Sequence, residues 1–168
     1  MDNKYIECTS PKPNTLTKTV TVALGAAAIA LFVITNADGL LFRWAYQFAA
    51  IVMLTAAAFT AQKFMLSGYR YIFDGESFIV KKLNGKREVE IASVNISTAK
   101  GLIGANNYSR VTELYGATQI SFNYCGSIAP ASPMWFIFDF NDKRCTLKFE
   151  PTIEFVREFS AALSSVNN

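Results

Sequence analysis

Two uncharged apolar runs near the N-terminus constrain this chain more than any other feature. The first occupies residues 19–35 and the second residues 44–61, and neither contains a charged side chain. An α-helix rises about 1.5 Å per residue, so each run with its apolar flanks can cross a hydrocarbon core of roughly 30 Å. The pattern therefore predicts two membrane-spanning helices and a turn between them, at residues 17–35, 44–66 and 36–43.

The connection between the two runs is short and rich in turn residues. Asn36, Asp38 and Gly39 can reverse the chain, which makes the two helices antiparallel neighbours. Alanines recur at helical spacing on both runs, and small residues let helices approach closely in lipid. The candidate helix-packing residues are Ala23, Ala27, Ala30, Ala50, Ala57, Ala58 and Ala61. The alternative is that alanine is simply common in such helices.

The first run has a second interpretation, as a secretory signal. Lys12 and Lys18 would be its basic region, and residues 35–37 loosely resemble a cleavage site. The length of the run, the second run directly after it, and the asparagine and aspartate at the site favour a span instead.

Orientation follows from the positions of Lys and Arg, which concentrate on the cytoplasmic side of a membrane. Cations flank the ends of the spans away from the turn: Lys12, Lys18, Lys63, Arg70, Lys81 and Lys82. The turn itself holds only Arg43. We therefore predict an integral protein of the inner (cytoplasmic) membrane with both termini in the cytoplasm. Residues 1–18, which include Pro11 and Pro13, are predicted to form a flexible cytoplasmic tail.

Beyond the spans, residues 67–168 have the composition of an ordinary soluble domain, and their apolar period changes from helical to alternating. Alternation of this kind predicts β-strands. About seven strands are expected from eight strand-like stretches, at residues 69–73, 78–81, 88–91, 94–97, 111–115, 118–125, 135–140 and 144–149. Residues 101–110 and 126–133 are expected to be loops, and Asn84–Gly85 is a strong hairpin signal. A helix is predicted over residues 152–163, with an apolar stripe of Ile153, Val156, Phe159 and Leu163.

This order of elements resembles a known family. The stretches that carry the resemblance are YRYIFDGESFIV, KKLNGKREVEIASV and CTLKFEPTIEFVREFSAAL. They resemble small bacterial membrane proteins with two spans followed by a pleckstrin-homology-like (PH-like) domain. The resemblance implies an all-β, partly open barrel with a C-terminal capping helix. It implies no enzymatic activity, and the wide break at residues 126–133 departs from the pattern.

Composition excludes several classes of function. The chain has no histidine, and its three cysteines lack metal-ligand spacing, so we expect neither a metal site nor a disulfide framework. A net charge of +3 is too weak for nucleic-acid binding. Without histidine or a phosphate-cradling glycine loop, neither an enzyme nor a cofactor is expected.

The clearest candidate binding residues are four cations around the predicted hairpin turn. Lys81, Lys82, Lys86 and Arg87 could attract anionic lipid headgroups. They could instead be solvated and pair with Glu88 and Glu90 across the strands. Tyr108, Ile128 and Pro130 lie on the two loops, where they could bind a partner or pack locally. An open sheet edge or a groove beside the terminal helix could also accept a partner's strand.

The sequence therefore predicts a non-enzymatic, membrane-tethered binding or scaffolding module. Its expected partners are the lipid bilayer and an unidentified protein, and it could form a homo-oligomer. Two other functions remain open at this point: an accessory subunit of a larger membrane transport or secretion complex, and an anionic-lipid-binding domain that uses the basic hairpin.

Overall fold

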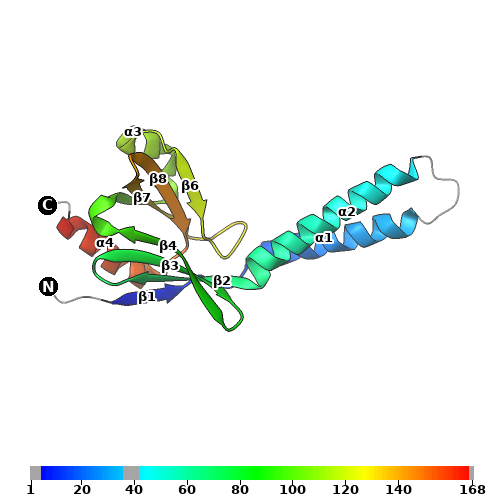
Figure 1. Cartoon of the computed structure of the whole chain (residues 1–168), viewed down its shortest axis with the longest axis horizontal. Helices are drawn as coiled ribbons and strands as arrows, with labels where there is room; N and C mark the ends of the chain where they lie inside the picture. The colour runs from blue at the N-terminus through cyan, green and yellow to red at the C-terminus, as the bar shows by residue number, and fades with distance from the viewer. Residues whose placement is uncertain (1–4, 36–41, 167–168) are drawn as a thin grey trace.

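Two long apolar helices project from a β-rich lobe in the computed structural model of the chain, which describes residues 5–35 and 42–166 (Figure 1). Helix α1 spans Thr15–Ile34, and helix α2 spans Arg43–Thr60 and continues into a π-helical turn, η1, at Ala61–Met65. Both helices are long and apolar enough to cross a membrane. The prediction of two packed apolar helices is therefore confirmed. The turn residues that motivated the hairpin, Asn36, Asp38 and Gly39, lie outside the described residues.

The contact between α1 and α2 uses a different face of α1 from the one expected. Ala50 and Ala57 are buried, and Ala27 and Ala61 are partly buried, whereas Ala23, Ala30 and Ala58 are exposed. The buried positions of α1 are instead Thr17, Thr21 and Ala28. The Thr21 hydroxyl donates to the carbonyl of Thr17 at 2.9 Å, which satisfies it within the helix. Of the three alanines expected on α1, Ala23 and Ala30 are thus exposed, and the buried alanine of this helix is Ala28.

The lobe contains two four-stranded sheets, with the orders β1-β2-β3-β4 and β5-β7-β8-β6. The strands are β1 (Ile6–Thr9), β2 (Ser67–Phe73), β3 (Ser77–Asn84), β4 (Arg87–Asn95), β5 (Ala99–Gly104), β6 (Ile120–Asn123), β7 (Met134–Phe140) and β8 (Lys143–Phe149). The helical segments of the lobe are η2 (Ile96–Thr98), η3 (Ala105–Arg110), α3 (Val111–Tyr115) and α4 (Ile153–Val166). Among the described residues the sheets do not close into a barrel.

Part of the expected flexible tail is a strand. Residues 6–9 form β1, which pairs antiparallel with β2 so that Ile6 faces Phe73 and Cys8 faces Tyr71. Ile6 and Cys8 both pack against the main core. This short alternation of apolar residues supplies the reason for the strand, and the prolines that follow at positions 11 and 13 end it.

Residues 99–115 also differ from the expectation of a loop followed by a strand. They form β5 and then, through η3, the short helix α3. Val111 is buried against Ile103 and Ile137, with Tyr115 packed beside them. Val111 and Tyr115 lie about one helical turn apart, so both reach this second, smaller core from one face of the helix. In addition, β6 pairs in parallel with β8, so the strands do not all follow one another as hairpins.

The main core is an aromatic cluster between the two sheets and α4. The Phe78 ring is its centre, with centroids at 5.0 Å from Phe149, 5.1 Å from Phe159 and 5.4 Å from Phe136. The apolar stripe of α4 is shifted from the expected one. Phe155, Phe159 and Leu163 are buried, whereas Ile153 is 87% exposed. The helix lies at the end of the lobe away from α1 and α2 (Figure 1).

Two tight turns show how backbone angles fix the strand register. Asn141 and Asp142, with φ of 50° and 59°, join β7 to β8 as both central residues of a hairpin loop, which is the type I′ pattern. Between β3 and β4, Asn84 pairs with Arg87, so the central residues are Gly85 and Lys86. Only Gly85 has a positive φ, at 61°. The predicted hairpin is present, but its turn lies one residue later than Asn84–Gly85.

Candidate functional site

The lobe is joined to the start of α1 by a cluster of hydrogen bonds, which we call the joint. The Asn14 side chain accepts from the backbone N–H of Thr17 at 2.9 Å and thereby caps the helix. Its amide donates to the carbonyl of Ala129 at 2.6 Å. The N–H of Asn14 donates to Ser127 Oγ at 3.2 Å, and the N–H of Ile128 donates to Thr17 Oγ1 at 3.1 Å. The loop of residues 126–133 is therefore held directly on the helix N-terminus.

The same region is closed by tight backbone contacts. The N–H of Ser10 donates to the Tyr69 carbonyl at 2.7 Å, and its hydroxyl accepts from the Tyr69 N–H at 3.0 Å. A Cβ placed on Gly126 would lie 2.8 Å from the carbonyl oxygen of Pro11, so only glycine fits there. On the other helix, Ser67 at the start of β2 donates to the Gln62 carbonyl in η1 at 2.9 Å. Only Leu66 therefore separates η1 from β2, and residues 10–14, between β1 and α1, are held to the lobe by hydrogen bonds of Ser10 and Asn14.

Several buried polar side chains lie beneath the loop of residues 126–133. Glu150, which is 5% exposed, accepts from the N–H of Ala131 at 2.8 Å. The Tyr71 hydroxyl donates to the carbonyl of Tyr124 at 2.6 Å, and burial raises its pKa. Burial also raises the pKa of the Cys125 thiol to about 12. Tyr71 and Cys125 are therefore neutral at physiological pH, and Cys125 serves as a small core residue.

An apolar cleft opens between the two sheets on the side of β4 and β6. Within the described residues, each of these strands pairs with one neighbour and leaves its other edge unpaired. The cleft has a volume of about 170 Å³ and is lined by residues 91–94 of β4, Phe122 of β6, Tyr124 directly after β6, and Phe138, Phe140 and Leu147. Phe122 is 36% exposed and Phe140 58% exposed. This arrangement, two free edges beside exposed apolar side chains, can accept an extended peptide.

The four hairpin cations are divided between two environments. Lys86 and Arg87 are exposed at the turn, whereas Lys81 and Lys82 are partly buried in β3. Glu88 pairs with Arg70 of β2 at 3.1 Å rather than with one of the four. Across residues 5–35 and 42–166, no ion pair involves Lys81, Lys82, Lys86 or Arg87.

Two acidic side chains lie close together at the C-terminal end of β7. Asp139 and Asp142 line one polar cavity of about 410 Å³ with Tyr115 and Gln119. Arg144 hydrogen-bonds Asp139 and holds the pKa of that carboxyl below its usual range, and Lys100 lies 3.4 Å from it. Asp139 is therefore an ionised partner of two cations, which is unlike a general acid. In the described part of the chain, no three potential metal-ligating side chains come together.

The loop residues expected as possible contacts behave differently from one another. Tyr108 stacks on Trp135 with ring centroids 4.4 Å apart, so its contact is local packing. Ile128 is 40% exposed, but its backbone belongs to the joint. Sequence reasoning missed the joint, although asparagine three residues before Thr17 is a typical N-cap signal.

The chain thus combines a hairpin of two apolar helices with a β-rich lobe that carries a C-terminal helix. Comparison with models of protein families, with curated proteins and with solved structures found no match for it.

Proposed function

We propose that this chain is a non-enzymatic binding or scaffolding module that two membrane spans tether to the cytoplasmic face of the inner membrane. The observation that carries the proposal is the joint. Asn14 and Thr17 bind the loop of residues 126–133 directly, and η1 runs straight into β2. A module that only needed to be near the membrane could use a flexible linker. The direct connection supports a lobe held in one position at the bilayer surface.

We further propose that the lobe is a PH-like, partly open barrel. In support, β2, β3 and β4 form an antiparallel meander, a second sheet packs against it, and α4 contributes Phe155 and Phe159 to the shared core. The additional strand β1 and the parallel pairing of β6 are this chain's departures from that pattern.

The cleft between β4 and β6 is the proposed binding site for a partner protein. An extended segment could add to either free edge through its backbone and place alternate apolar side chains beside Phe122 and Phe140. Tethering raises the effective concentration of such a site for partners that are themselves in the membrane. This supports a scaffolding role better than a role in solution.

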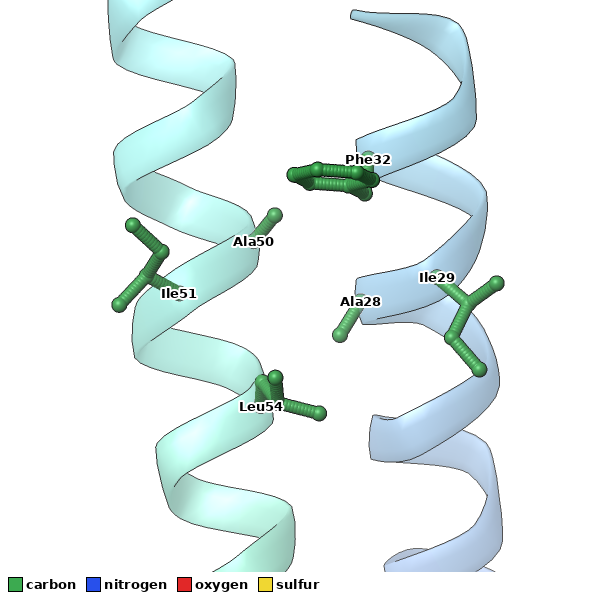
Figure 2. A pocket seen from close by; sticks show the side chains of 6 residues that line it. All are labelled: Ala28, Ile29, Phe32, Ala50, Ile51 and Leu54. Atoms are coloured by element: carbon green, nitrogen blue, oxygen red, sulfur yellow. The ribbon is translucent and has the colours of Figure 1, made fainter.

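A groove between the helices favours a second candidate function, the accessory subunit. It has a volume of about 280 Å³ and an entirely apolar lining: Ala28, Ile29, Phe32, Ala50, Ile51 and Leu54. Figure 2 shows Ala28, Phe32, Ala50 and Leu54 directed toward the space between α1 and α2. A third helix from a larger complex could pack there against the exposed apolar side chains of the groove, which are Ile29, Phe32, Ile51 and Leu54.

The membrane anchor is tested first. We expect the full-length protein to remain in the membrane pellet after an alkaline carbonate wash, because two spans cannot be stripped by charge or pH. A reporter fused after Asn168 should be active in the cytoplasm. Release by carbonate, or an N-terminus at Asp38 in the purified protein, would contradict the proposal.

Site-specific photocrosslinking in native membranes separates the two candidate functions. A photoreactive residue at Phe122 is expected to yield an adduct with an extended apolar segment of a partner. Leu114 is the matched control, since it is apolar and 56% exposed but does not line the cleft between β4 and β6. Adducts at Ile29 with none at Phe122 would favour the accessory subunit, and an adduct of Phe122 with its own sequence would identify a homo-oligomer.

A further inference from the structure

A small cavity lies where α2 meets the lobe. Its lining comes from α2, η1, β2 and β3: Phe59, Gln62, Lys63, Tyr69 and Lys82. Its volume is about 270 Å³. The segment Arg43–Met65 is the second candidate span, so the cavity lies at the lobe end of that span. In Figure 1 this is also the end of the lobe toward which the β3–β4 hairpin extends.

The strand register explains why a lysine lines this cavity. In the pairing of β2 with β3, Phe73 faces Phe78, Tyr71 faces Val80 and Tyr69 faces Lys82. Directly paired residues lie on the same face of a sheet. Lys82 therefore continues the inward face of Phe78 and Val80, at the point where the core ends and the cavity begins. A lysine at an inward position is costly unless its charge meets a partner.

The second cation reaches the cavity from the helix. Lys63 is partly buried, and its ammonium lies 5.2 Å from the centre of the Phe64 ring. No carboxylate lines the cavity, and within residues 5–35 and 42–166 neither Lys63 nor Lys82 forms an ion pair. Glu88, on the neighbouring strand β4, forms its ion pair with Arg70 instead. Two ammonium groups on one cavity repel each other, and a bound anion would turn this repulsion into attraction.

We propose that this cavity binds the phosphate of an anionic phospholipid. Lysine is a compact charge with three donors, which suits phosphate oxygens. The source of the phosphate is a lipid because one wall of the cavity is Phe59, an apolar side chain of the candidate span that is 63% exposed. The acyl chains would lie along this wall while the headgroup meets Lys63 and Lys82. The inference rests on the proposed membrane anchoring.

The test uses full-length protein in nanodiscs that contain equal amounts of phosphatidylglycerol and phosphatidylcholine. Lipids that remain bound after release are counted by native mass spectrometry. Wild type is expected to retain phosphatidylglycerol preferentially. The double variant Lys63→Gln/Lys82→Gln should lose roughly twentyfold of that preference, and each single variant about fivefold, from the typical effect of one cation near a lipid surface. If the double variant does not fold, the two single variants test the proposal.

The matched control is Lys86→Gln/Arg87→Gln, which removes the same charge from the exposed turn. This control should keep the wild-type preference for phosphatidylglycerol. An equal loss of preference in the control would overturn the proposed site, because the preference would then depend only on the total charge of the lobe. Unchanged lipid retention in the Lys63 and Lys82 variants would also overturn it. If millimolar inorganic phosphate stabilised the wild type as much as phosphatidylglycerol does, the ligand of the cavity would be a free anion and not a lipid. Failure to enter nanodiscs at all would instead contradict the anchoring.

Discussion

Replacement of Phe159 by alanine is expected to destabilise the lobe by about 3–5 kcal/mol, the usual cost of truncating a buried phenylalanine. Phe159 is fully buried on α4. Its ring centroid lies 5.3 Å from Phe73, 5.1 Å from Phe78 and 5.3 Å from Phe136, so it contacts both sheets. Small domains have only about 5–15 kcal/mol of stability in total, so this loss would leave the lobe close to unfolding at 37 °C.

The same helix supplies the control. Ile153→Ala also truncates an apolar side chain of α4, but Ile153 is 87% exposed, so its effect should stay within about 0.5 kcal/mol. Urea unfolding of full-length protein in detergent, followed by near-ultraviolet circular dichroism, measures both variants. Equal stability of the two variants would contradict the placement of α4 over the aromatic core.

The second large effect is expected at the joint. Gly126→Ala should weaken the joint by about 1–3 kcal/mol, because the new methyl group would lie 2.8 Å from the backbone oxygen of Pro11, and neither backbone can move cheaply. The hydrogen bonds from Asn14 to the loop would loosen first. Hydrogen–deuterium exchange should therefore rise in residues 10–17 and 126–131, while the aromatic core stays protected.

Gly25→Ala is the matched substitution on α1. No atom lies within 4 Å of a Cβ added at Gly25, and alanine favours a helix over glycine. This variant should leave exchange at the joint unchanged. Unchanged exchange in the Gly126 variant as well would mean that the loop of residues 126–133 does not restrain α1.

The elements that sequence periodicity predicts well are those whose environment is uniform along their length. The two long helices are apolar over most of their length, and β8 and α4 pack against the main core. The sequence pattern fails where a contact with residues far away in the chain determines the secondary structure. Residues 111–115 are predicted as a strand from the sequence, but they form a helix whose Val111 packs against Ile103 and Ile137. Strand β1 exists because β2, far along the chain, offers it an edge.

The candidate sites divide in the same way. Sequence reasoning named Lys82, but as one of four equivalent hairpin cations. Its inward position follows from its pairing with Tyr69, and its neighbour Lys63 comes from a helix in another part of the chain. The cleft was foreseen only as an unspecified open edge. Its lining depends on which strands remain unpaired after both sheets have formed, and that is a property of the topology.

The pairing of β1 with β2 has a consequence for assembly in the cell. These strands are adjacent in one sheet, yet the whole helical hairpin separates them in the chain. Pairing of β1 with β2 therefore closes a loop of chain that contains both helices, and in a protein anchored as proposed it requires both ends of that loop on the same side of the membrane. Under the proposed anchoring, a chain with only one helix inserted would leave β1 and β2 on opposite sides of the bilayer, and this sheet could not be completed.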